Sequence, residues 1–124
     1  MTVLVIDDED DIRLLAEVGL KASGLEVVAA ASGAEGVTLA HTHAPDLIVL
    51  DLMMPDMDGY ATLDALRRDP VTEPIPVLML TARNLTASEA ALRGKGVVDF
   101  VAKPFVPRRV RAPRSPSPRG RDAA

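Results

Sequence analysis

Five short apolar runs recur along the chain, and most are rich in leucine or β-branched residues. Their apolar residues are nearly continuous rather than alternating with polar ones, which is typical of strands buried on both faces of a sheet. The pattern therefore predicts five buried strands. The runs are Val3–Ile6, Val27–Ala31, Leu47–Leu50, Ile75–Leu80 and Val97–Ala102.

Four segments between these runs carry helix signals. Two place apolar residues on one stripe of a helix, and two begin with the spacing of a capping box. Strands and helices that alternate in this way predict an α/β domain with a parallel sheet and helices on both faces. The signals are the Ile12, Leu15, Ala16 and Leu20 stripe ended by Gly24, the Ser32–Glu35 box, the Tyr60, Leu63 and Leu66 stripe ended by Asp69 and Pro70, and the Thr86–Glu89 box.

The amino-acid composition excludes several classes of protein and of functional site. A chain of 124 residues with 48% apolar residues can form a single core, and 2% aromatic residues make that core aliphatic. The absence of cysteine excludes disulfides, thiolate metal sites and cysteine nucleophiles. No run approaches the roughly 20 apolar residues that span a bilayer, and no signal peptide is visible. We therefore expect a cytoplasmic protein without a membrane partner.

Charge is distributed unevenly between the body and the end of the chain. Residues 1–106 hold 17 acidic and 8 basic residues, a net charge of −9, whereas residues 107–124 hold six arginines and one acid, a net charge of +5. An acidic body is not typical of a nucleic-acid-binding fold. Without a recognition helix, the basic tail predicts only counterion-type attraction to nucleic acid.

Polar residues follow four of the five predicted strands. Asp7 and Asp8 follow the first, Asp51 the third, Thr81 the fourth and Lys103 the fifth. In open parallel sheets, ligands bind outside the carboxyl ends of the strands, so these side chains should meet at one edge. The second strand delivers no comparable group, as expected of a strand at the edge of the sheet.

These residue types suit phosphoryl chemistry. Three carboxylates form a site for a hard divalent cation such as Mg²⁺. A hydroxyl and an ammonium can then hold a phosphoryl group, and one carboxylate can act as its nucleophilic acceptor.

Four motifs at these positions resemble the receiver domain of two-component response regulators. They are IDDEDDI, VLDLMMPDMDG, LMLTA and DFVAKPF, and the resemblance runs from about Thr2 to Phe105. It implies a doubly wound five-stranded sheet of flavodoxin-like order 2-1-3-4-5. It also implies a signalling switch, not an enzyme, that accepts a phosphoryl group from a sensor histidine kinase or phosphotransfer protein and then changes its partner-binding surface.

The resemblance also implies roles at the metal and phosphoryl site. Asp51 would be the phosphoacceptor. Asp8 and Asp51 would bind Mg²⁺ directly together with the backbone carbonyl of Met53, and Asp7 would act largely through metal-bound water. Thr81 and Lys103 would contact the phosphoryl oxygens.

The same resemblance implies two conformational features. Phe100 sits at the aromatic switch position, where rotation inward accompanies movement of Thr81 toward the phosphoryl group. The Lys103–Pro104 peptide bond is typically cis in the family, although cis is rare for X–Pro bonds in general.

A phosphatase of the haloacid-dehalogenase type is the rival enzyme interpretation. Such enzymes also use an aspartate at a strand end, but they place a second aspartate two residues on, followed by threonine or valine. Here Asp8 and Asp10 are followed by Asp11, and we expect no cap domain.

Three further features are interpreted as structural. The Asp56–Gly59 segment indicates a turn in which Gly59 is free to take a positive φ. Met53, Met54 and Met57 indicate an adaptable loop surface. His41 and His43 indicate a solvated helix terminus.

The tail departs most from the family pattern. We expect a receiver domain over residues 1–106 and a disordered segment over 107–124, because Pro113, Pro116 and Pro118 forbid a continuous closing helix. The sheet flank near the first and fifth strands should then be poorly covered, which favours a homodimer or a swapped dimer. A natural end, a truncation and a frameshift all fit the tail. We expect the phosphorylated domain to act on either a downstream protein or a missing output domain. We expect no direct DNA binding by this domain.

Overall fold

The computed structural model describes residues 1–54, 57–81 and 92–102, and it contains a five-stranded parallel sheet. The strands are β1 (Thr2–Ile6), β2 (Glu26–Ala30), β3 (Leu47–Asp51), β4 (Val77–Thr81) and β5 (Val97–Ala102). The helices are α1 (Asp10–Ala22), α2 (Gly33–His43) and α3 (Gly59–Arg68). The sheet order β2-β1-β3-β4-β5 confirms the predicted topology, with β2 at one edge.

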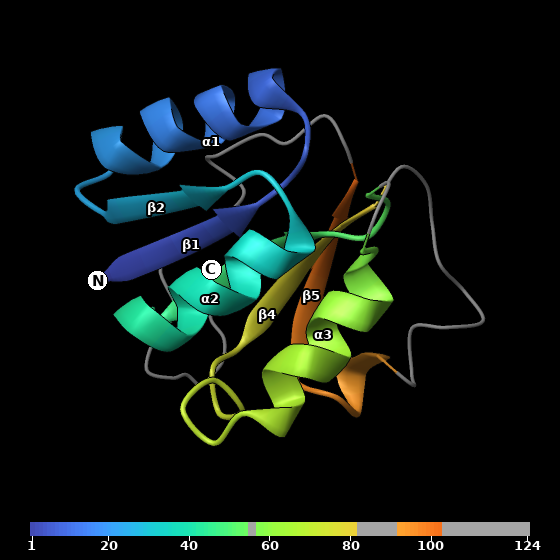
Figure 1. Ribbon diagram of the computed structural model, residues 1–124. Helices are drawn as coiled ribbons and strands as arrows, with labels where there is room; N and C mark the ends of the chain where they lie inside the picture. The colour runs from blue at the N-terminus through green and yellow to red at the C-terminus, as the bar shows by residue number, and fades with distance from the viewer. Residues whose placement is uncertain (55–56, 82–91, 103–124) are drawn as a thin grey trace.

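Successive residues of each strand enter two separate cores. Leu4, Ile6 and Leu50 pack toward α2 and α3, whereas Val3 and Val5 pack toward α1. This alternation is the period of two expected of a strand. Figure 1 shows α2 and α3 together on one side of the sheet and α1 on the other. The near-continuous apolar runs therefore reflect burial on both faces.

Helix ends follow the sequence signals closely. Ser32 caps α2 by accepting a hydrogen bond from the Glu35 N–H at 3.1 Å, and the Glu35 side chain accepts one from the Ala31 N–H at 2.8 Å. Gly24 has a φ of +88° just after α1, and its N–H donates to the Lys21 carbonyl. The Ser32 cap and the glycine stop are confirmed, although the Glu35 side chain reaches the Ala31 N–H rather than the Ser32 N–H of an ideal capping box.

Two predicted stripes include residues that the fold leaves at the surface. Leu15 of α1 is 44% exposed and Tyr60 of α3 is 38% exposed, whereas Ala16, Leu20 and Leu63 are buried. A helix presents only part of its circumference to a sheet, so residues at the margin of a stripe face solvent. The fourth strand also begins later than predicted, because Ile75 donates its N–H to Thr72 in a turn and Pro76 precedes the strand.

Two interpretations of loop residues were wrong. Gly59 is the first residue of α3 rather than a positive-φ turn residue. A Cβ there would lie 2.6 Å from the Leu52 Cα and 2.7 Å from the Asp51 carbonyl oxygen, so close approach requires glycine. Met54 is buried in the core, because its side chain packs into the cluster beneath α3, while Met53 remains exposed. His41 and His43 are exposed in the last turn of α2, as predicted for a solvated helix terminus, and His41 also contacts Asp69.

The sheet flank near the first and fifth strands is also better covered than predicted. Val3, Val5 and Val101 are all buried, and they belong to the same apolar cluster as Leu80. The Thr86–Glu89 box, the fifth helix and the segment 107–124 lie outside the described residues. Within the residues that are described, no helix has both the length and the apolar character to cross a membrane.

Candidate functional site

The site lies at the carboxyl ends of β1, β3 and β4. Ile6 pairs with Leu50 in the β1–β3 register, so Asp7 and Asp51 follow paired residues on adjacent strands. Carboxylate oxygens of Asp7, Asp8 and Asp51 all lie within 4.8 Å of one another. The sheet register has therefore brought Asp51 close to Asp7 and Asp8, which lie 44 and 43 residues before it in the sequence.

The three acids differ in burial. Asp7 is fully buried and Asp51 is 1% exposed, whereas Asp8 is partly exposed. Charged carboxylates are costly to bury together unless a cation or hydrogen bonds compensate them. An arrangement of this kind fits a hard divalent cation, which takes oxygen ligands and keeps several waters. Asp8, at the solvent side, leaves room for those waters.

Backbone hydrogen bonds fix two of the carboxylates. The Glu9 N–H donates to Asp7 Oδ1 at 2.9 Å, which closes the turn from β1 into α1. The Met53 N–H donates to Asp51 Oδ1 at 3.3 Å. These contacts hold each carboxylate in one orientation because they close short loops that begin at the strand end.

Arg13 supports this edge, a role that its position in the sequence did not indicate. Its Nη1 donates to the Asp7 backbone carbonyl at 2.8 Å, and its Nη2 pairs with Asp10 in the same helix. The only sequence signal was the spacing of three residues between Asp10 and Arg13. The contact to Asp7 depends on the angle at which α1 leaves β1, so it could not be read from spacing.

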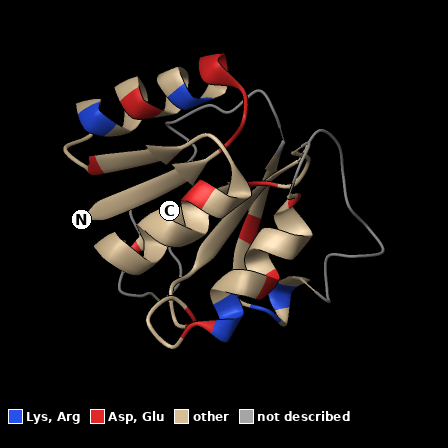
Figure 2. Ribbon diagram, viewed as in Figure 1, with Lys and Arg blue, Asp and Glu red and all other residues tan. Residues whose placement is uncertain are grey.

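Thr81 lies at the same edge of the sheet. Leu80 pairs with Asp51 across β3 and β4, which puts Thr81 one residue beyond that pair, and its side chain is 4% exposed. Thr81 in turn pairs with Ala102 of β5. Lys103 and Pro104 come next in the sequence and lie outside the described residues. Figure 2 shows acidic ribbon at the ends of β1 and β3.

Phe100 lies further from the carboxylates, within β5. It pairs with Met79 of β4, and its ring packs against the core on the α2–α3 side. The Arg93 guanidinium carbon lies 5.1 Å from the centroid of the ring. The predicted switch residue is thus partly buried and covered by a cation in this structure.

Comparisons with known proteins agree with this arrangement. The sequence pattern of the response regulator receiver domain matches residues 3–113. The regulatory protein PhoP of Bacillus subtilis is 40% identical over 110 residues, and RpaA of Synechocystis is 42% identical over 103 residues. These alignments cover 89% and 83% of the chain but only 45% and 43% of the two relatives, so the chain spans less than half of their length.

Solved structures of similar proteins share this fold over most of the chain. The N-terminal domain of a response regulator receiver protein from Methanoculleus marisnigri is 42% identical, with a TM-score of 0.78, covering 83% of this chain and 84% of that one. Vibrio cholerae CheY4 is 32% identical with a TM-score of 0.81, covering 86% and 89%. The matched pattern, the sheet order and the acidic edge together show that this chain belongs to the response regulator receiver domain family.

Proposed function

We propose that the chain is a phosphorylation-dependent signalling switch in which Asp51 accepts a phosphoryl group from a sensor histidine kinase or a phosphotransfer protein. The convergence of Asp7, Asp8 and Asp51 within 4.8 Å at the carboxyl edge carries the proposal. Asp51 is the central member because it ends the middle strand of the five. Membership of the response regulator receiver domain family supports the same reaction, the acceptance of a phosphoryl group.

The transfer can be written as one displacement. A carboxylate oxygen of Asp51 attacks the phosphorus of a phosphohistidine, the P–O bond forms, and the P–N bond breaks. The leaving imidazole keeps the bonding electron pair and binds a proton, while Asp51 becomes an acyl phosphate. The hydrogen bond from the Met53 N–H to Oδ1 fixes the carboxylate for this attack.

Charge is the main barrier at this site. An incoming phosphoryl group is anionic, and three clustered carboxylates repel it. A Mg²⁺ ion bound by Asp8, Asp51 and the Met53 backbone carbonyl, with Asp7 acting through water, would offset that charge and stabilise the transferring phosphoryl group. The Thr81 hydroxyl can donate to a phosphoryl oxygen. Lys103, which follows β5 in the sequence, would contact the phosphoryl oxygens through its ammonium group.

Phosphorylation would then alter the partner-binding surface through Thr81 and Phe100. We propose that Thr81 moves toward the phosphoryl group and that the Phe100 ring turns inward beside it. The output is a downstream protein or an output domain, reached by protein contact rather than by DNA binding of this domain. Both PhoP and RpaA bear names of transcriptional regulators.

Intact mass spectrometry after incubation with Mg²⁺ and acetyl phosphate tests the assignment. We expect a single acid-labile phosphoryl adduct that is lost in Asp51→Asn and retained in Asp58→Asn. Asp58 is the matched control because its carboxylate caps α3 by accepting from the Ala61 N–H. Undiminished labelling of Asp51→Asn would refute the assignment, and many turnovers of a chromogenic phosphate ester would favour a phosphatase instead.

A further inference from the structure

The Phe100 ring is covered on one face by Arg93. In addition to the 5.1 Å approach of its guanidinium carbon to the ring centroid, Arg93 donates from Nη1 to the Val98 carbonyl at 3.0 Å. Phe100 also packs against the core beneath α2 and α3. Arg93 is exposed, so it adds little to that core. Its two contacts both fall on β5, on either side of Asp99.

The turn that carries Arg93 is itself anchored. The Lys95 N–H donates to the Leu92 carbonyl at 2.9 Å, and the Gly96 N–H donates to the Arg93 carbonyl at 3.1 Å. The Lys95 ammonium donates to Asp64 Oδ1 of α3 at 2.8 Å. Gly96 has a φ of +91°, which glycine adopts without strain. Arg93 is therefore presented to Phe100 from a fixed base, which reduces the entropy lost when the contact forms.

The pairing of β4 with β5 explains why Val98 offers its carbonyl. Val77 pairs with Val97 but Leu78 pairs with Asp99, so Val98 is an extra residue in β5 at a register shift. A bulged residue is left outside the regular ladder. Arg93 supplies a donor at this irregularity and stabilises the strand end from which Phe100 projects.

Phe100 is coupled to the proposed phosphoryl site through β4. It pairs with Met79, and two residues further along the same strands Thr81 pairs with Ala102. A turn of the ring out of its present orientation would break its contact with the Arg93 guanidinium. We propose that Arg93 is a latch that holds Phe100 in its resting orientation and thereby lowers the affinity of the Asp51 site for a phosphoryl group.

The latch rests on the proposed function. The size of its effect on the affinity for a phosphoryl group follows from thermodynamic linkage between the resting and active states. A contact made only in the resting state lowers the apparent affinity for a ligand of the active state by the factor that the contact contributes. A cation–π contact at an exposed site contributes a factor of about two to five. Arg93 would thus be a positioning residue, because it touches neither Asp51 nor a phosphoryl group.

Beryllofluoride, which mimics a phosphoryl group on aspartate, provides the test. Its affinity in the presence of Mg²⁺ is measured by calorimetry for the unmodified chain and for Arg93→Gln, Arg93→Lys and Arg68→Gln. We expect Arg93→Gln to bind about two- to fivefold more tightly. Arg93→Lys, which keeps the cation, should restore part of the latch. Arg68→Gln removes the same charge from an exposed position on α3 and should behave like the unmodified chain.

A double substitution separates the latch from a general effect of charge. In a Phe100→Leu background, where no ring remains, Arg93→Gln should leave the affinity unchanged. Equal affinities of Arg93→Gln and Arg68→Gln would overturn the latch while leaving the proposed function intact, as would an undiminished effect of Arg93→Gln in the Phe100→Leu background. Failure of the unmodified chain to bind beryllofluoride would overturn the proposed function and the latch together.

Discussion

Asp8 and Glu9 are adjacent acids with different structural positions. The Asp8 carboxylate belongs to the cluster with Asp7 and Asp51, whereas the Glu9 side chain is exposed at the N-cap position of α1. The contact from Glu9 to Asp7 uses the Glu9 backbone N–H, which substitution by alanine preserves. The two residues therefore allow a direct comparison between a metal ligand and an acid at a helix N-terminus.

We expect Asp8→Ala to lower the affinity for Mg²⁺ by at least about tenfold, because even supporting groups around a metal typically contribute that much. Glu9→Ala should leave the affinity nearly unchanged. Titration with Mg²⁺, followed by NMR of the β1–α1 loop, measures both. Equal losses in the two variants would mean that the acidic run serves only the helix N-terminus and its dipole.

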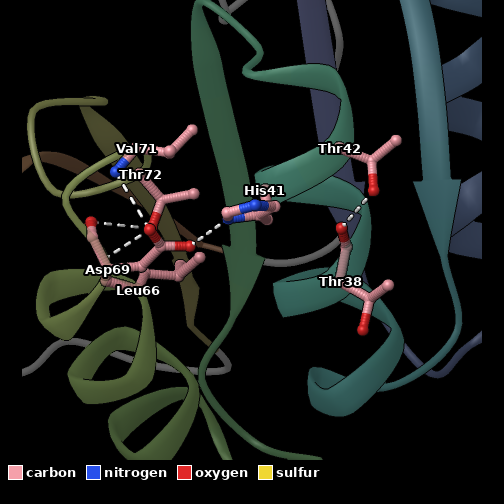
Figure 3. Close-up of polar contacts among 7 residues, drawn as sticks. All are labelled: Thr38, His41, Thr42, Leu66, Asp69, Val71 and Thr72. Carbon is pink, nitrogen blue, oxygen red and sulfur yellow. Dashed lines mark hydrogen bonds and ion pairs between the residues drawn. The ribbon is translucent and has the colours of Figure 1, made fainter.

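At the scale of elements, a set of polar contacts joins the ends of α2 and α3. We call it the clasp, and it consists of His41, Asp69, Val71 and Thr72. His41 Nδ1 lies 2.6 Å from Asp69 Oδ2, and the Val71 N–H donates to Asp69 Oδ1 at 2.9 Å. The Thr72 hydroxyl donates to the Leu66 carbonyl at 2.6 Å, which closes the last turn of α3. Figure 3 shows Asp69 between His41 on one side and Val71 on the other. The clasp thus connects one helix to the loop that precedes β4.

The clasp predicts a pH-dependent contribution to stability. The hydrogen bond with His41, followed by that from the Val71 N–H, lowers the pKa of Asp69. Because the folded-state pKa lies below the unfolded value of about 3.9, the contribution is fully present above that value and is lost as pH falls through the folded pKa. Asp69→Asn should therefore lower the free energy of unfolding near pH 6, and the difference should shrink below about pH 4.

Urea unfolding of both chains at several pH values measures this difference. His41→Gln is the matched control, since it removes the inter-helix contact but keeps the bond from Val71 to Asp69. His41→Gln should lower the free energy of unfolding by less than Asp69→Asn does. A loss that is the same at pH 6 and at pH 3 would exclude the carboxylate as its source.

At the scale of the whole molecule, the acidic edge links metal binding to folding. The three carboxylates come from β1 and β3, and unfolding would separate them, so Mg²⁺ should bind the folded chain preferentially. At a concentration 100-fold above Kd, such a ligand stabilises the fold by about 2.7 kcal/mol. A domain of this size gains about 4 °C in melting temperature for each kcal/mol.

Calorimetry with MgCl₂, and with NaCl at equal ionic strength, checks this prediction. Mg²⁺ should raise the melting temperature by roughly 10 °C or more, and Asp51→Asn should reduce the increase. If NaCl raised the melting temperature as much as MgCl₂, general screening of the acidic body would explain the effect and a specific site would not.

Patterns that act over a few residues determined most of the architecture. Near-continuous apolar runs specified strands buried on both faces, and the Ser32 box and Gly24 specified helix ends, because each depends on local hydrogen bonds or local burial. Alternation of strands and helices then specified a parallel sheet. Because ligands bind at the carboxyl ends of parallel strands, the residues expected at that edge were Asp7, Asp8, Asp51 and Thr81. The four motifs, taken together, indicated the family.

Tertiary structure decided what depends on approach between distant segments. The burial of Met54, the space requirement at Gly59 and the pairing of His41 with Asp69 all arise from how α2 and α3 lie against the sheet. The Arg13 contact to Asp7 arises from the direction in which α1 leaves β1, and the Arg93 contact to the Val98 carbonyl arises at a register shift in β5. Spacing along the chain carries no signal for these distances, because each one is set by the packing of whole elements.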